Sequence, residues 1–128
     1  MGYYFSKTIN TDFEGAIQKV TEALKAEGFG ILTEIDMKAT LKKKLDVDFY
    51  NYKILGACNP PFAYKALKTE DKIGTMLPCN VIVQEKEKGQ VEVSVVDPVA
   101  SMKAIENDEL HDIATEIRGR LQRVIENL

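Results

Sequence analysis

Two short segments hold the residues of this sequence that are best suited to chemistry. One is Cys58-Asn59-Pro60 and the other is Pro78-Cys79-Asn80. They lie in the two longest charge-free stretches of the chain, Ile54–Tyr64 and Ile73–Gln84. A cysteine acts as a nucleophile or a metal ligand through its thiolate, which a helix N-terminus or a nearby cation stabilises. These two segments are therefore the first place to look for a functional site.

The two cysteines have four possible uses, which the sequence leaves open. Free cysteine is among the most buried residue types, so Cys58 and Cys79 can be small apolar core residues. They can be redox or nucleophilic thiols, since Cys58 lies directly before a predicted helix. They can bind a metal, although His111 is the single histidine and Cys-X-X-Cys spacing is absent. They can also line a ligand pocket without taking part in chemistry.

The neighbouring polar residues have structural alternatives too. Asn59 and Asn80 could offer a pair of amide groups to a ligand. A helix cap at Asn59, with Pro60 at the first helical position, and a strand-edge hydrogen bond at Asn80 are the structural interpretations. His111 falls at the border of an apolar helical stripe, which predicts a half-exposed side chain. Without a second histidine or a paired nucleophile, no hydrolase triad can be assembled.

The segments that must position these residues alternate between strand and helix patterns. Apolar residues at helical spacing follow the capping-box pair Thr11 and Glu14, and Gly28 ends that helix. Further helices are predicted after Asp36, after Asn59 and after Asp97, and one over Leu110–Leu128. Strands are predicted at Tyr3–Ile9, Phe29–Ile35 (with Phe29, Ile31, Thr33 and Ile35 on one half-buried face), Tyr52–Cys58, from Pro78 onward, and Gln90–Val96.

This order, β-α-β-α-β-α-β-β-α, predicts an α+β fold with a mainly antiparallel sheet backed by helices. Cys58 ends one strand and Cys79 begins the next, so antiparallel pairing would bring both thiols to one end of the sheet. The hairpin around Lys88-Gly89 favours that arrangement. A disulfide between the thiols would need Cα atoms within about 7 Å, which only the antiparallel arrangement favours.

Length and charge limit the classes of protein to consider. A chain of 128 residues fits one domain, taken here as residues 1–128. A net charge of −3 argues against a dedicated nucleic-acid binder. No apolar run approaches the roughly 18 residues of a membrane span, and no leader pattern precedes a cleavage site. We therefore expect a cytoplasmic protein with no nucleic-acid or membrane partner.

The paired motifs also carry a family resemblance. The run Ile54–Pro60 followed by Leu77–Val81, with flanking blocks at Glu34–Leu41 and Asp97-Pro98, resembles domain-of-unknown-function family 302 over nearly the whole chain. The resemblance implies a sheet of the TATA-binding-protein-like type backed by helices, often in a homodimer. It implies no activity, and fold likeness does not carry DNA binding with it.

Three functional hypotheses follow. The first is a homodimeric domain that binds a small ligand or a metal near Cys58, Asn59, Pro60, Cys79 and Asn80, and it predicts two neutral thiols. The second is a thiol-dependent redox or transfer enzyme, which needs an exposed thiol of low pKa. The third is an interaction module in which both cysteines are structural. Any metal would use Cys58 and Cys79, and the sequence identifies no cofactor.

Overall fold

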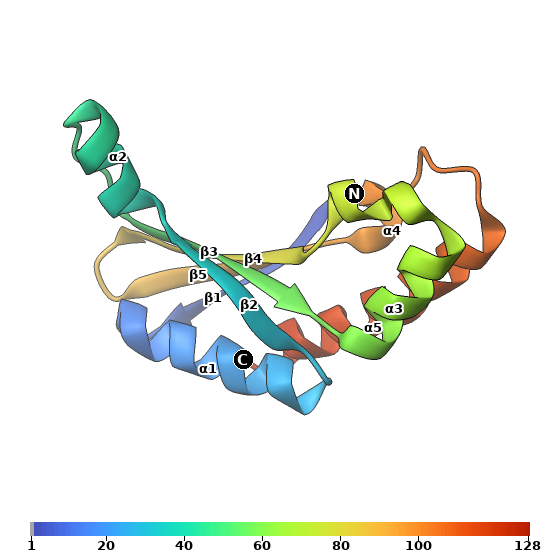
Figure 1. Cartoon of the computed structure of the whole chain (residues 1–128). Coiled ribbons are helices and arrows are strands. Elements are labelled where there is room, and N and C mark those ends of the chain that lie inside the picture. Colours follow the sequence, from blue (N-terminus) through green and yellow to red (C-terminus); the bar gives the residue numbers. More distant parts are fainter. Residues whose placement is uncertain (1) are drawn as a thin grey trace.

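The computed structural model describes residues 2–128, which form one five-stranded antiparallel sheet with the two longest helices packed on one of its faces (Figure 1). The strands lie in the order β1-β5-β4-β3-β2. The predicted α+β fold and element order are confirmed. The strands are β1 (Tyr4–Asn10), β2 (Gly30–Asp36), β3 (Asn51–Cys58), β4 (Cys79–Glu87) and β5 (Gln90–Val96). The helices are α1 (Phe13–Ala26), α2 (Met37–Leu45), α3 (Pro60–Thr69), the 3₁₀ helix η1 (Asp71–Met76), α4 (Pro98–Ser101) and α5 (Asp108–Glu126).

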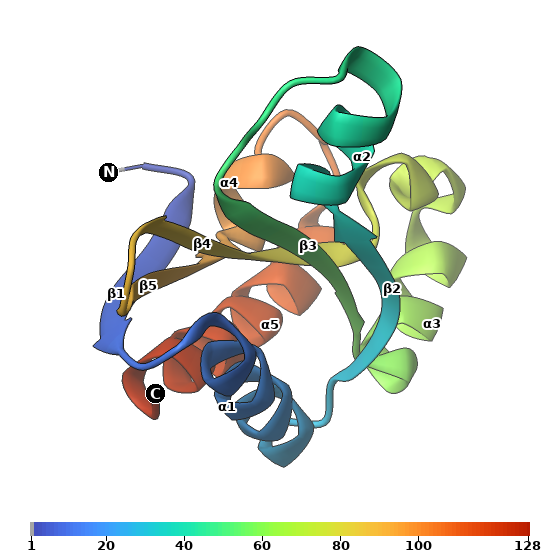
Figure 2. The same cartoon turned by 90° about the vertical axis from the view of Figure 1, so that its left-hand side faces the viewer.

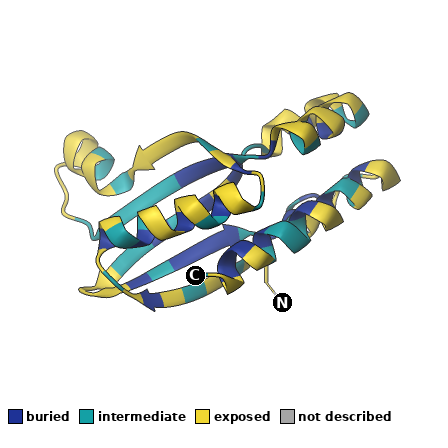
Figure 3. Ribbon diagram, turned by 90° about the horizontal axis from the view of Figure 1, so that it is seen from below, coloured by how far each residue is buried: buried dark blue, intermediate teal, exposed yellow. Residues whose placement is uncertain are grey.

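Helices α1 and α5 cover one face of the sheet, and the other face has no such cover (Figure 2). Alternate residues of β4 and β5 are fully buried against these helices, because side chains along a strand point to opposite faces. The burial colouring shows the same division, with buried residues between helices and sheet and exposed residues on the outer helix surfaces (Figure 3). The buried strand residues are mostly valine: Val81, Val83, Val91, Val93 and Val95.

The ends of α1 show one confirmed and one wrong prediction. The helix begins one residue later than the Thr11 capping box predicts, because Asp12 is the N-cap and its carboxylate accepts a hydrogen bond from the Gly15 N–H at 2.8 Å. An anionic acceptor is favoured at the positive end of the helix dipole. Gly28 ends the helix as predicted, with a φ of +87° that glycine adopts without strain.

Strand β2 differs most from its predicted form. The sequence predicts Ile31, Thr33 and Ile35 on one half-buried face, but the register with β3 shifts between Ile31 and Thr33. Ile31 pairs with Ala57 on the helix-covered side, whereas Ile35 pairs with Ile54 on the open side. A bulge of this kind inserts one residue and reverses which face the following residues occupy. The single-face prediction is therefore wrong from Thr33 onward.

Helix α2 projects away from the rest of the molecule (Figure 1). Asp36 caps it as predicted, and its carboxylate accepts from the Ala39 N–H at 2.9 Å. None of its residues is buried, and Leu45 at its end is 66% exposed. The apolar side of this helix therefore has little contact with the domain itself.

Gly56 lets β2, β3 and the start of β4 approach closely. A Cβ atom at this position would collide with Thr33 Oγ1 and would lie 2.6 Å from Pro78 Cγ. Because Gly56 lies two residues before Cys58, this close approach fixes how the end of β3 meets the chain that leads into Cys79.

None of the helices formed by residues 2–128 is long and apolar enough to cross a membrane.

Candidate functional site

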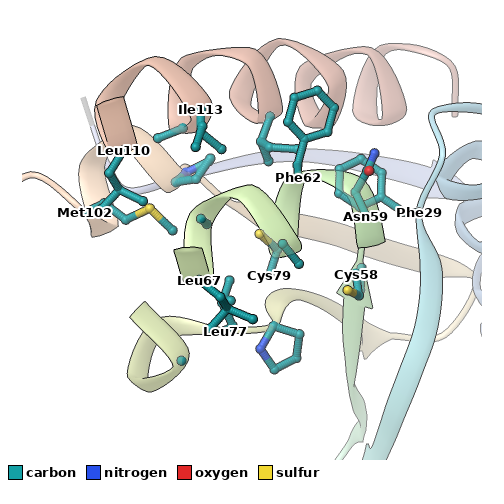
Figure 4. Close-up of a pocket in the computed structure, with 18 of the residues that line it drawn as sticks. Phe29, Cys58, Asn59, Phe62, Leu67, Leu77, Cys79, Met102, Leu110 and Ile113 are labelled. Carbon is teal, nitrogen blue, oxygen red and sulfur yellow. The ribbon is translucent and has the colours of Figure 1, made fainter. Parts of the chain in front are cut away.

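A cavity of about 320 Å³ lies at the end of the sheet where β3 stops and β4 starts (Figure 4). Its walls come from these two strand ends and from α3, η1 and α5. Among residues 2–128, none that lines it is charged, and Asn59 and the two thiols are its only polar side chains. The cavity therefore offers a ligand an almost wholly apolar surface.

The cavity lies where two hydrophobic clusters meet. The larger cluster fills the space between the sheet and helices α1 and α5, and it contributes Phe29, Ala57 and Ile117 to the wall. A second, smaller cluster lies under α3 and contributes Met102 and Leu110. Chain 59–78 leaves the sheet after β3 and returns at β4, so α3 and η1 form a separate wall above the end of the sheet.

Both thiols lie at this end of the sheet, as predicted for antiparallel strands. Cys79 pairs with Ala57 in the β3–β4 register, and Cys58 is the next residue along β3. Cys79 therefore shares the helix-covered face with Ala57, whereas the strand alternation turns Cys58 toward the opposite face. Both cysteines are free, and both line the cavity. Neighbouring backbone positions with diverging side chains do not suit a disulfide.

Burial keeps both thiols in their neutral form. Removal from water raises the pKa of Cys79 from 9.0 to about 11, and the proximity of Cys58 adds to this shift. Burial also raises the pKa of Cys58. The N-terminus of α3 does not compensate, since Pro60 and Pro61 occupy the first helical positions and have no N–H groups to direct at a thiolate. At neutral pH the cavity wall presents two S–H groups and no thiolate nucleophile.

Asn59 connects the end of β3 to the end of α1. It is the N-cap residue of α3, as predicted, but its side chain makes no capping hydrogen bond. Instead, Asn59 Nδ2 donates to the Glu27 backbone oxygen at 3.3 Å, and Arg120 Nη1 donates to the same oxygen at 3.0 Å. The predicted capping role of the side chain is wrong, because the amide is oriented toward Glu27 and the N–H of Phe62, the third helical residue, does not donate to it.

The remaining predicted site residues lie outside the cavity. Asn80 pairs with Gly56 on the open face of the sheet, where it borders a separate depression that also contains Tyr52 and Ile82. Pro60 is exposed at the start of α3. The structure therefore brings Cys58, Asn59 and Cys79 together and separates Asn80 and Pro60 from them. Asn59 and Asn80 do not form a pair of amides around one ligand.

Sequence reasoning did not identify the helical and loop walls of the cavity. The sequence of α5 has an apolar stripe that includes Leu110, Ile113 and Ala114. A stripe that packs against a core has the same sequence pattern as one that faces a cavity. Phe29 and Met102 come from segments distant in sequence. No local pattern places such residues beside the two cysteines.

A metal site has little support in the described part of the chain. Residues 2–128 contain no group of three or more His, Cys, Asp or Glu side chains positioned to hold a metal ion. His111 is half-buried, as predicted, and it is not among the residues that line the cavity. Its Nε2 atom is buried and has no hydrogen-bond partner among these residues.

Comparison with known proteins identifies relatives but no activity. Residues 5–128 match the model of a family described as domain of unknown function DUF302. The chain is also similar to a solved structure, the crystal structure of an uncharacterized conserved DUF302 protein from Bacillus stearothermophilus. The TM-score is 0.90 at 27% sequence identity, over 99% of this chain and 98% of that chain. No curated protein matches the chain.

Proposed function

The chain belongs to the DUF302 family, and we propose that it is a binding protein that holds a small, uncharged, apolar ligand in the cavity beside Cys58 and Cys79. The observation that carries this proposal is the wall of the cavity, which has no charged residue and two thiols that burial keeps neutral. Such a wall suits the transfer of an apolar molecule from water.

The size of the cavity supports a small ligand. Small-molecule sites typically enclose about 300–1,000 Å³, so 320 Å³ lies at the lower end. An engineered apolar cavity of roughly 150 Å³ already binds benzene. The cavity of this protein is therefore large enough for a two-ring aromatic molecule or a short alkyl chain, and too small for a large cofactor.

The thiol-dependent enzyme is less well supported by this geometry. A catalytic thiol needs a lowered pKa, and in this cavity the pKa values of both thiols are raised. No lysine, arginine or histidine in the described part of the chain lines the cavity to stabilise a thiolate. The two cysteines are therefore better suited to forming a polarisable wall.

A probe-binding experiment tests the proposed function. We expect 1-methylnaphthalene to raise the Tm of the purified protein and to slow the alkylation of Cys58 and Cys79 at pH 8, with both effects saturating together. At a free probe concentration of about 100 times Kd, the stabilisation should reach about 2.7 kcal/mol. The measurements are differential scanning fluorimetry and mass spectrometry of the alkylated protein.

Naphthalene-1-sulfonate is the matched control for this experiment. It has the same ring system with an anionic group, which an uncharged cavity should exclude. Equal protection by the two molecules would indicate surface binding. Absence of an effect with 1-methylnaphthalene at its solubility limit would contradict the proposed function.

A second copy of the chain is the partner that we propose for the open face of the sheet. This face carries Tyr4 and Ile35, which are 49% and 45% exposed, together with half-buried Ile54 and Ile82. Antiparallel sheets commonly have one polar, hydrated face, so large apolar side chains here favour an interface.

The oligomeric state tests this partner. We expect light scattering to give twice the mass of 14.4 kDa, and we expect Ile82→Lys to shift the protein to the monomer, because the new charge would be buried against the second copy. Glu22→Lys, at an exposed position of α1 on the other side of the molecule, is the control and should leave the dimer intact. A monomeric wild-type protein at about 100 µM would contradict the proposal.

A further inference from the structure

We infer that the ligand of this cavity carries one hydrogen-bond donor, a hydroxyl or N–H group on an apolar body, and that this group binds the side-chain oxygen of Asn59. The inference depends on the proposed function, since it names the chemical class of ligand that the same cavity would hold. Its basis is the arrangement of the Asn59 amide, one of the residues that line the cavity (Figure 4).

The Asn59 side chain is fixed by one of its two polar atoms. Nδ2 donates to the Glu27 backbone oxygen, an acceptor outside the cavity wall. This bond determines the orientation of the planar amide. Oδ1, the second polar atom of the amide, takes no part in it. Asn59 is only 6% exposed, so bulk water has little access to it. No backbone or side-chain group of residues 2–128 donates a hydrogen bond to Oδ1.

The usual donors to an N-cap side chain do not reach Oδ1. The side-chain oxygen of an N-cap residue normally accepts from the N–H of the second or third helical residue. The second helical residue is Pro61, which has no N–H, and the structure shows no capping bond from the third. Oδ1 is therefore an acceptor without a donor from residues 2–128, and it is not fully closed off from its surroundings, so a donor from outside the chain can reach it.

The rest of the wall restricts what that partner can be. No charged side chain is available to pair with an ionic group, so a charged ligand would lose its hydration without compensation. The thiols of Cys58 and Cys79 stay protonated and are weak donors, so they offer no second acceptor comparable with an amide oxygen. One acceptor in an apolar wall selects a neutral molecule with one donor.

The volume sets the size of the apolar body. The cavity is about twice the roughly 150 Å³ that holds benzene, which corresponds to about a dozen non-hydrogen atoms. Naphthalene derivatives with one substituent have this size. They also allow the donor to be replaced while the ring system stays the same.

Binding of three probes to the wild-type protein and to two variants tests the inference. The probes are 1-naphthol, which has a donor, 1-methoxynaphthalene, which has an acceptor only, and 1-methylnaphthalene, which has neither. Kd values are measured by calorimetry, and each association constant, 1/Kd, is divided by the cyclohexane/water partition coefficient of the probe to give a corrected affinity. In the wild-type protein we expect the corrected affinity of 1-naphthol to exceed those of the other two by about fivefold or more.

Asn59→Leu should abolish this preference for 1-naphthol, because leucine has a similar shape and no acceptor. Arg120→Leu is the matched control, since it removes the other donor to the Glu27 oxygen and leaves Asn59 in place. The control should keep the preference. If Asn59→Leu does not fold, the comparison of 1-naphthol with 1-methoxynaphthalene on the wild-type protein still tests the preference for a donor, and equal corrected affinities there would overturn the inference.

The possible outcomes separate the inference from the function on which it depends. If no probe binds, the proposed function itself is wrong. If all three probes bind with equal corrected affinities, or if Asn59→Leu keeps the preference, the cavity binds apolar ligands but Asn59 does not select a donor. A preference that is present in the wild-type protein and in Arg120→Leu, and lost in Asn59→Leu, supports the inference.

Discussion

Leucine in place of Ala114 should weaken the binding of 1-methylnaphthalene by about 50-fold and leave the fold intact. Ala114 is 2% exposed on α5 and faces the cavity, so the three added carbon atoms occupy space that the probe needs. Each buried carbon contributes about 0.8 kcal/mol, so displacing three of them removes about 2–3 kcal/mol of binding free energy. Calorimetric titration of wild type and variant measures the difference.

The thermal stability of Ala114→Leu distinguishes a filled cavity from a disrupted core. Leucine that enters the cavity buries apolar surface, so the Tm should stay unchanged or rise, whereas overpacking would lower it. Ala26→Leu, at an exposed position at the end of α1, is the control and should change neither binding nor Tm. Unaltered probe affinity in Ala114→Leu would place the probe outside the cavity.

The free energy of unfolding should fall by about 2 kcal/mol between pH 9 and pH 11 because of Cys79 alone. The unfolded chain releases the Cys79 proton near its ordinary pKa of 9.0, whereas the folded chain holds it up to a pKa of about 11. The stabilisation is therefore complete below pH 9 and is lost as the pH rises through 11, at about 1.4 kcal/mol per pH unit.

Comparison with Cys79→Ala isolates this contribution. Tyrosine and lysine side chains titrate in the same range, so the quantity to measure is the difference in unfolding free energy between the two reduced proteins in urea. The variant should be less stable at pH 7 by about 1 kcal/mol, the usual effect of a small core deletion. The difference should shrink and reverse toward pH 11. A constant difference across this range would show that the Cys79 thiol ionises in the folded state as freely as in the unfolded chain.

The features that the sequence predicted well are those with local causes. Gly28 ends α1 because its backbone conformation suits glycine, and Gly89, with a φ of +84°, turns the β4–β5 hairpin in the same way. Asp36 caps α2 through a bond to a residue three positions along the chain. The β4–β5 hairpin favoured antiparallel pairing of the neighbouring strands, and the structure confirms that Cys58 and Cys79 lie at one end of the sheet.

The features that the sequence did not predict depend on contacts between distant segments. The bulge in β2 is set by its pairing with β3, since Thr33 must pass close to Gly56. Asn59 forms its hydrogen bond with Glu27, 32 residues earlier, and no local pattern indicates this partner. The cavity itself depends on how α3 and α5 pack above the sheet end. An apolar stripe is compatible with either a filled core or a ligand wall.

The bulge in β2 also affects how molecules of this protein can meet. Strand β2 forms one edge of the sheet, and a regular exposed edge is a template for strand addition and for amyloid-like growth. The bulge at Leu32 interrupts the row of free backbone groups, and Glu34, paired with Lys53 at 2.8 Å, adds charge to that edge. Edge-to-edge aggregation is thereby disfavoured along β2.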